Sequence, residues 1–234
     1  MKYGPGQAQK LEGHDPSTGG EMYLRGLNRW QAEEQREDMA DLYVESSITT
    51  PGNEYRGREV FLRRLAEDVS RPGFDMMVAE ATVAAEAPTV VGCIFGHPVQ
   101  RDGSWWEGFQ GELRQDIEQL TASGHLFAIT EIVIHPHEQH RGLAGRLQER
   151  LLGEHEATLA VTKVDEADHA RCAAFRSWGW QDIGQASKPS DPGFLRVLVL
   201  PLGERSPGVP DGLAHNAGTE RPGEADAQDP GMRS

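Results

Sequence analysis

The sequence predicts an α/β sandwich, in which helices pack against a sheet. Two apolar runs of strand character, Phe74–Glu80 and Val90–Phe95, flank a turn at Ala87-Pro88 and favour a β-hairpin. Later in the chain, strand-like runs alternate with segments of helical periodicity. The 234 residues are enough for one sizeable domain or two small ones.

The N-terminal part is expected to contain a short strand and then a helix. Residues 1–20 carry almost no large apolar side chains, so we expect a disordered leader there. A strand is expected over Met22–Leu27. Asn28 then caps a helix that extends to about Ser47.

A second helix is expected between a loop at 46–57 and the hairpin. Pro51, Gly52 and Asn53 indicate the loop. The helix ends at Arg71-Pro72-Gly73, a strong stop signal. Its apolar residues recur at helical spacing: Leu62, Leu65, Ala66 and Val69.

The central stretch predicts a buried strand, a tight turn and a helix. Leu126–Ile134 is apolar and rich in β-branched residues, and Pro136 ends it. The helix that follows shows an apolar stripe: Leu143, Leu147 and Leu151.

Around and beyond this stretch, shorter elements complete the predicted sheet. A polar helix is expected over Glu112–Ala122, and a strand over Thr158–Val164. Asp168 caps a helix that ends near Gly179. A closing pair of strands is expected over 180–186 and 194–200. Residues 203–234 are rich in Pro, Gly, Asp and Glu, and we expect a disordered acidic tail.

Composition narrows the class of protein. The formal net charge of −14 argues against nucleic acid as the main partner and is compatible with a cationic substrate. The two cysteines, Cys93 and Cys172, lie in apolar contexts typical of buried free thiols. The sequence shows neither a signal peptide nor a long apolar span, so we expect a cytoplasmic protein that does not enter a membrane.

The turn after the central strand has the chemistry of an anion site. The first amides of a helix have no partners within the helix, and the helix dipole makes that end partly positive. Gly142, Ala144 and Gly145 let an anion approach this backbone closely. Neither a Walker motif nor the G-x-G-x-x-G spacing of dinucleotide sites is present.

This turn resembles the pyrophosphate loop of the GNAT family of N-acetyltransferases. Gln139, Gly142 and Ala144 match the family motif Gln/Arg-x-x-Gly-x-Gly/Ala, and Ile134-His135-Pro136 matches the step before it. Downstream, ADHARCAAFRSWGW (167–180) resembles the family's later helix, S-N-x-A-x-x-x-Y-x-x-x-G-F. The two motifs occur in the family's order.

The resemblance implies a GNAT-like α/β (α+β) fold. Its central sheet would be mixed and mostly antiparallel, with six to seven strands flanked by helices, and splayed between the fourth and fifth strands. Residues 21–202 would form a single N-acetyltransferase domain. Residues 100–124 would be an insertion, because the family usually has a much shorter turn there.

The resemblance also implies an activity. Acetyl-CoA would be the co-substrate, without a metal, and the acetyl group would pass directly to a primary amine of a small molecule. Acetylation of a protein lysine or N-terminus is an alternative, and so is a degenerate acyl-CoA sensor with little turnover. A homodimer is one expectation for the assembly.

Most of the expected cofactor contacts use backbone. The pantetheine arm would pair with the central strand, as an added strand does. The pyrophosphate would take amides from the turn, and Arg141 could add a charge-assisted bond. The expected cofactor-binding residues are Ile132, Val133, Ile134, Gln139, His140, Arg141, Gly142, Leu143, Ala144, Gly145, Asp168 and Phe175.

Glu131 is the expected general base and also an expected substrate contact. It is the one charged residue in the apolar run, and a carboxylate costs energy to desolvate there. A solvent-facing or arginine-paired glutamate is the alternative. Trp105 and Trp106 are expected either to bind the acceptor or to cover the core.

Three further positions bear on the chemistry. Phe175 stands where the family commonly has a tyrosine that protonates the leaving thiolate, and Asp168 stands where it commonly has asparagine. Water could supply the proton instead. A histidine cluster (His135, His137 and His140) lacks the companions of a recognisable metal motif, so no metal is expected.

Overall fold

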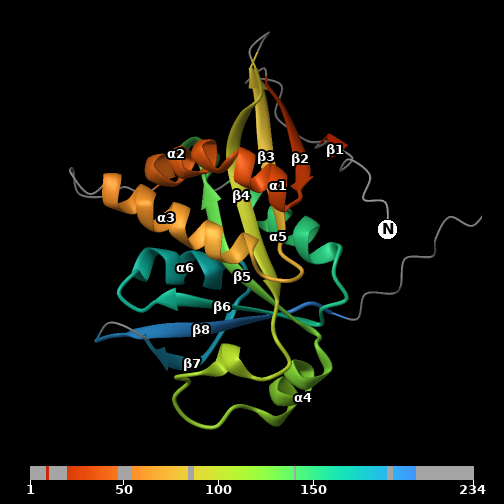
Figure 1. Ribbon diagram of the computed structural model, residues 1–234, viewed down its shortest axis with the longest axis vertical. Helices are drawn as coiled ribbons and strands as arrows, with labels where there is room; N and C mark the ends of the chain where they lie inside the picture. Colours follow the sequence, from red (N-terminus) through yellow and green to blue (C-terminus); the bar gives the residue numbers. More distant parts are fainter. Residues whose placement is uncertain are drawn as a thin grey trace, which may run out of the picture. The chain divides into compact units, whose positions relative to one another are not determined.

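A computed structural model describes residues 9–10, 20–46, 54–83, 87–139, 141–188 and 192–203 (Figure 1). The strands are β1 (Gln9–Lys10), β2 (Gly20–Leu27), β3 (Asp75–Val83), β4 (Thr89–Pro98), β5 (Leu126–Ile134), β6 (Leu159–Asp165), β7 (Gln181–Ser187) and β8 (Phe194–Pro201). The α-helices are α1 (Arg29–Glu34), α2 (Arg36–Ser46), α3 (Glu54–Val69), α4 (Gln115–Ser123), α5 (Leu143–Gly153) and α6 (His169–Ser177). Two short 3₁₀ turns, Ser104–Trp106 and Pro136–Glu138, complete the described elements.

One sheet joins all the described strands in the order β1-β2-β3-β4-β5-β6-β8-β7. Neighbouring strands are antiparallel except β5 and β6, which are parallel. The expected mixed, mostly antiparallel sheet is therefore confirmed. It has eight strands rather than six to seven, because Gln9–Lys10, within the expected leader, pairs with β2.

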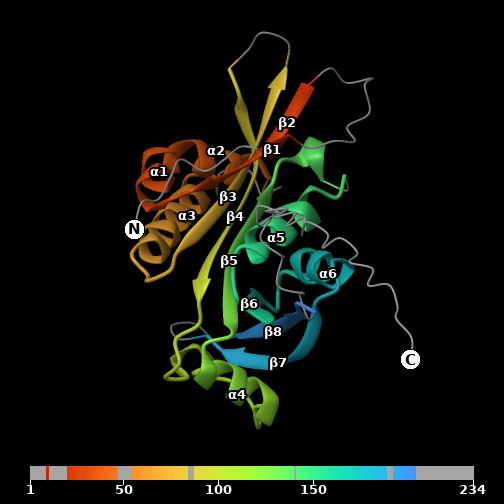
Figure 2. The same cartoon turned by 90° about the vertical axis from the view of Figure 1, so that its right-hand side faces the viewer.

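Helices cover both faces of the sheet (Figure 2). The first three helices, α1, α2 and α3, pack on one face through a core that includes Met39, Phe61 and Phe95. On the other face α5 and α6 pack through a core that includes Leu147 and Phe175. Helix α4 covers the half of the sheet formed by β6, β8 and β7.

Two expectations about the first helices were wrong in detail. Asn28 does cap a helix, and its side chain accepts from the amides of Trp30 and Gln31. That helix, however, stops at Glu34, and the chain continues through Gln35 into a separate helix, α2. The loop expected at 46–57 is also too long, since α3 already begins at Glu54. Gly57 lies inside α3, because glycine costs a helix only about 1 kcal/mol.

The later elements follow the predicted order. The hairpin is confirmed as β3 and β4, and β5 has the predicted bounds, Leu126–Ile134. The expected polar helix begins at Gln115 rather than Glu112. The closing strands do pair, but β8, the last strand in the chain, lies between β6 and β7.

A β-bulge shapes the centre of the sheet. Phe95 pairs with Glu131, whereas the next residue, Gly96, pairs with Ile129, so Thr130 is the extra residue of β5. A Cβ on Gly96 would lie 2.0 Å from the carbonyl oxygen of Ala128. Only glycine fits this close approach of the two backbones, and the bulge sets the direction of Glu131.

Candidate functional site

The sheet is open between β5 and β6. The two strands pair through only three residues each, Leu126–Ala128 with Leu159–Val161. Beyond them β5 continues to Ile134 along β4, and β6 continues to Asp165 along β8. We call this divergence the fork. It lies between the fourth and fifth strands that the sequence predicts, as expected.

One edge of β5 lacks a strand partner within the fork. Ile132, Val133 and Ile134 pair with Ile94, Cys93 and Gly92 of β4, but among the described residues no strand pairs with their other side. Backbone groups on such an edge can bind an extended ligand, as strand addition does. The three predicted pantetheine contacts therefore all lie on the open edge.

After this edge the chain forms the 3₁₀ turn Pro136–Glu138 and then reaches the N-terminus of α5. Gly142 is the N-cap residue of α5 and has a left-handed backbone with φ 76°. No side chain caps the helix at that residue, and a Cβ on Gly142 or Gly145 would meet nothing within 4 Å. The open space and the uncapped amides suit an anion.

The other residues of the predicted loop support this end of the helix. Gln139 donates from Nε2 to the carbonyl oxygen of Ile134 at 3.3 Å, which ties the loop to β5. Leu143 and Ala144 are buried in the core, so only their backbone can serve a ligand. The half-exposed side chain of Arg141 pairs with Glu138 at 3.4 Å. His140 lies outside the described residues.

Glu131 is buried and is held by two arginines. Its side chain is only 1% exposed. Its Oε2 accepts from Arg64 of α3 at 2.6 Å, and its Oε1 accepts from Arg171 of α6. Burial opposes the charge of Arg171, but the adjacent carboxylate outweighs it and raises the pKa of that guanidinium. Both carboxylate oxygens of Glu131 therefore accept hydrogen bonds. To act as a general base, Glu131 would have to lose at least one of them.

A second buried carboxylate, Asp68, lies further along α3, the helix that carries Arg64. Asp68 of α3 forms an ion pair with Arg71, with Nε 3.2 Å from Oδ1, and Nε2 of His97 on β4 lies 3.9 Å from the same oxygen. Burial raises the pKa of Asp68 and lowers the pKa of His97. Oδ2 of Asp68 is buried and has no hydrogen-bond partner among the described residues.

Helix α6 carries the two positions that depart from the family motif. The side chain of Asp168 accepts from the amide of Arg171 at 2.9 Å, so it caps the helix as predicted. Phe175 is fully buried, with ring centroids 5.3 Å from Trp178 and 5.2 Å from Trp180. The guanidinium of Arg171 lies 5.9 Å from the Phe175 ring centroid.

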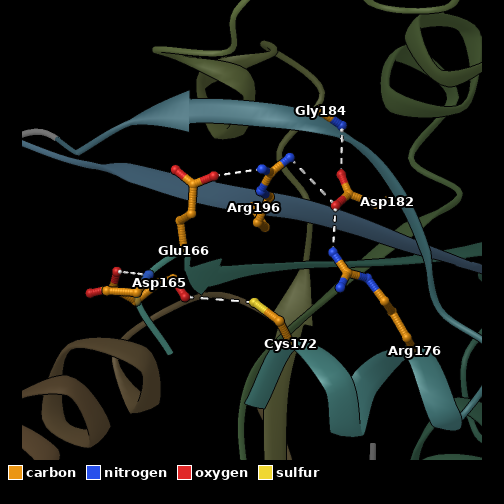
Figure 3. A network of polar contacts seen from close by, with 8 residues as sticks. Asp165, Glu166, Cys172, Arg176, Asp182, Gly184 and Arg196 are labelled. Atoms are coloured by element: carbon orange, nitrogen blue, oxygen red, sulfur yellow. Dashed lines mark hydrogen bonds and ion pairs between the residues drawn. The ribbon is translucent and has the colours of Figure 1, made fainter. Parts of the chain in front are cut away.

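A polar network anchors α6 to the last two strands (Figure 3). Arg176 of α6 pairs with Asp182 of β7 at 3.0 Å, and Arg196 of β8 lies 3.7 Å from the same carboxylate. Arg196 also pairs with Glu166 at 2.5 Å. These contacts hold α6, and with it Arg171, in place beside the fork.

Trp105 and Trp106 differ in their surroundings. Trp106 is buried and donates from its indole nitrogen to Thr121 at 2.9 Å, which is core packing. Trp105 is half-buried and faces Lys163 of β6, whose Nζ lies 4.6 Å from the ring centroid and donates to the Trp105 carbonyl. Burial lowers the pKa of Lys163.

A cavity of about 640 Å³ lies within the segment 101–122. It is lined by residues from Arg101 to Ala122, among them Trp106, and by none of the residues of the fork. Trp106 therefore lines this cavity and not the fork, whereas Trp105 contacts Lys163 of β6.

Histidines and cysteines are the remaining side chains with ligand chemistry. The described residues contain no cluster of three or more metal-ligating side chains, and His135 instead lies 3.5 Å from Glu45. Both cysteines are free and buried, as expected, and burial raises the pKa of each thiol. None of the described helices has the length and apolar character needed to cross a membrane.

Arg64 and Arg171 were missed by the sequence analysis. Arg64 follows Phe61 by three residues and precedes Asp68 by four, so it lies on the buried side of α3. That spacing is the sequence signal that could have identified Arg64. No sequence signal points to Arg171, because only the fold brings it to Glu131.

No family model matches the sequence, and neither does any curated protein. Solved structures do resemble the fold. The PaiA N-acetyltransferase from Thermoplasma acidophilum in complex with coenzyme A is 11% identical, with a TM-score of 0.48, 77% of this chain covered and 98% of that one. A spermidine N-acetyltransferase chimera from Vibrio cholerae is 11% identical, with a TM-score of 0.47 and coverage of 77% and 95%. The ribosomal-protein-S18-alanine N-acetyltransferase from Escherichia coli is 12% identical, with a TM-score of 0.44 and coverage of 80% and 98%. At these identities and TM-scores, the likenesses assign no role to any residue of this chain.

Proposed function

We propose that this protein is an acetyl-CoA-dependent N-acetyltransferase that transfers an acetyl group directly to the primary amine of a small molecule. One observation carries the proposal. The open edge of β5 is followed in the chain by the 3₁₀ turn Pro136–Glu138 and then by the N-terminus of α5, where Gly142 is the N-cap residue. An extended arm that ends in a pyrophosphate needs these two surfaces in that order.

Each part of the site would serve one part of the ligand. The backbone of Ile132, Val133 and Ile134 would hold the pantetheine arm. The amides of the turn and of the first residues of α5 would hold the pyrophosphate, with Arg141 beside them. When bound, acetyl-CoA supplies an activated acyl group on sulfur. The residues at the fork orient the amine and exclude water from it.

Amide formation needs a proton acceptor for the amine and donors for the developing oxyanion. A backbone amide of Val133 or Ile134 on the open edge would be the oxyanion donor. Glu131 is the proposed base, and it could act once one of its two arginine bonds is released. Phe175 has no proton to give, so water would protonate the thiolate, a fair leaving group near neutral pH.

A panel of primary amines tests the proposal. The full-length protein would be mixed with acetyl-CoA, and thiol release would be followed with dithionitrobenzoate. Amine-dependent release with a matching N-acetylated product is expected for at least one small molecule. Tight coenzyme A binding without turnover on any amine would favour the acyl-CoA sensor, which the double arginine pairing of Glu131 also suits.

A further inference from the structure

Two arginine side chains share one buried carboxylate at the fork. Arg64 and Arg171 both reach Glu131, so two guanidinium groups face one carboxylate. Lys163 adds a third cation on β6, two residues beyond Val161, the last residue that pairs with β5. Asp168, which caps α6, is the other carboxylate that acts on Arg171. Asp68 also acts electrostatically on Arg64, and Glu107 acts on Lys163, so carboxylates balance these cations.

The two arginines come from opposite sides of the sheet. Glu131 pairs with Phe95, whose side chain packs in the core beneath α1, α2 and α3, so Glu131 faces α3. Helix α6 packs on the other face (Figure 2). Arg171 can therefore reach Glu131 only where β5 has no neighbouring strand, which places its guanidinium in the fork.

Both arginines have N–H donors that Glu131 leaves unused, and both side chains are partly exposed. A guanidinium carries five N–H donors. Each arginine donates to Glu131 through one terminal nitrogen, and Tyr43 also acts electrostatically on Arg171. The side chains of Arg64 and Arg171 are 37% and 27% exposed, against 1% for Glu131. A small ligand can reach the donors that Glu131 leaves unused.

We infer that the acceptor amine carries a carboxylate, as an amino acid does, and that Arg64 and Arg171 bind it. Guanidinium groups recognise carboxylates through paired, charge-assisted hydrogen bonds. The bound carboxylate would leave the amine of the same molecule near Glu131 and the open edge of β5. This inference rests on the proposed function and narrows it.

Matched acceptors test the inference. Amino acids, their carboxamides and the corresponding decarboxylated amines would be compared by thiol release with the full-length protein. For at least one amino acid we expect a KM at least about tenfold lower than that of its carboxamide, with the decarboxylated amine no better. Carboxamides or plain amines that serve equally well would overturn the inference.

A variant pair assigns the effect to Arg64. Arg64→Gln should reduce the KM preference for the amino acid over its carboxamide by about tenfold to a hundredfold, the range expected for a charge-assisted bond. Arg63→Gln is the matched control, because Arg63 is the exposed neighbour on the same helix. If Arg64→Gln changes only the melting temperature, the arginine merely holds α3 to the sheet, and the inference fails.

A binding experiment distinguishes a failure of this inference from a failure of the proposed function. If no amine of any group is acetylated, the proposed function fails, and calorimetry still decides the acceptor class. N-acetylated amino acids and their carboxamides would be titrated into the protein saturated with coenzyme A. At least tenfold tighter binding of one of the acids, lost in Arg64→Gln, supports the carboxylate site. Equal binding, or binding of neither, overturns it.

Discussion

Arg171 of α6 donates a hydrogen bond to Glu131 of β5, although α6 packs on the face of the sheet that Glu131 does not face. The contact exists because β5 and β6 cease to pair after Ala128 and Val161. The same opening leaves an edge of β5 without a strand partner. A single feature of the sheet therefore sets both the charge of the proposed acceptor site and the backbone surface of the proposed cofactor site.

Gly142→Asp is expected to abolish acetyl-CoA binding in a folded protein. Open space surrounds the missing Cβ, so the new side chain fits, but its charge would face the pyrophosphate. Calorimetry would measure the affinity, and circular dichroism would check the fold. Gly142→Asn is the control, since asparagine tolerates the left-handed backbone about as well without adding charge. Equal affinity of the Asp variant and the wild type would exclude this turn as the pyrophosphate site.

Glu131→Gln is expected to lower both stability and kcat. Removing the carboxylate leaves two guanidinium groups without their partner, a loss of about 3 kcal/mol for a buried pair. If Glu131 is the base, kcat should also fall by ~10²-fold at neutral pH. Acetyl-CoA affinity should barely change, because the cofactor uses backbone here. Thermal melts and steady-state kinetics would measure the two effects.

Arg64→Gln separates the two roles of Glu131. It removes one of the same ion pairs but keeps the carboxylate, so it should lower the melting temperature without lowering kcat for an acceptor that has no carboxylate. A Glu131→Gln enzyme with the kcat of the wild type would show that Glu131 is structural only.

Phe175→Tyr is expected to preserve or raise activity. It places a hydroxyl where the resembling family commonly has one, and the guanidinium of Arg171 already lies over this ring. Kinetics at neutral pH would measure it, with circular dichroism as the control for folding. Much lower activity in a folded variant would mean that the added hydroxyl disturbs the contacts of Phe175 with Trp178 and Trp180.

Asp68→Asn is expected to raise the melting temperature at pH 8, or at least not lower it. Burial raises the pKa of Asp68 above its unfolded value of about 3.9. A carboxyl group with a raised pKa contributes stability below its unfolded pKa and loses it as the pH rises through the folded pKa. The Asp68→Asn variant has no carboxyl group to ionise at this position. Its gain in melting temperature over the wild type should therefore shrink as the pH falls to 4.

Melts of Asp68→Asn and wild type from pH 4 to pH 8 would measure the difference. Asp116→Asn is a suitable control, because Asp116 is an exposed partner of Arg114. If Asp68→Asn melts well below the wild type at pH 8, attraction to Arg71 and His97 outweighs the cost of burial.

Local signals explain why much of the fold was predictable. The apolar run of β5 has the bounds that its composition indicates, because β-branched residues and a following proline act on the chain locally. The caps at Asn28 and Asp168 also form as predicted, since each needs only its own next few residues. The break at Gln35 and the early start of α3 depend on weaker preferences, and there the sequence analysis was wrong.

The sequence by itself determined the order of the elements, the glycine-bearing turn and the isolated carboxylate of Glu131. All of these are expressed within a few neighbouring residues. Only the tertiary structure decided that Glu131 has partners, because Arg64 is 67 residues away and Arg171 is 40 residues away along the chain. Such contacts depend on where the sheet opens and on which helices pack beside the opening, and no local pattern encodes either.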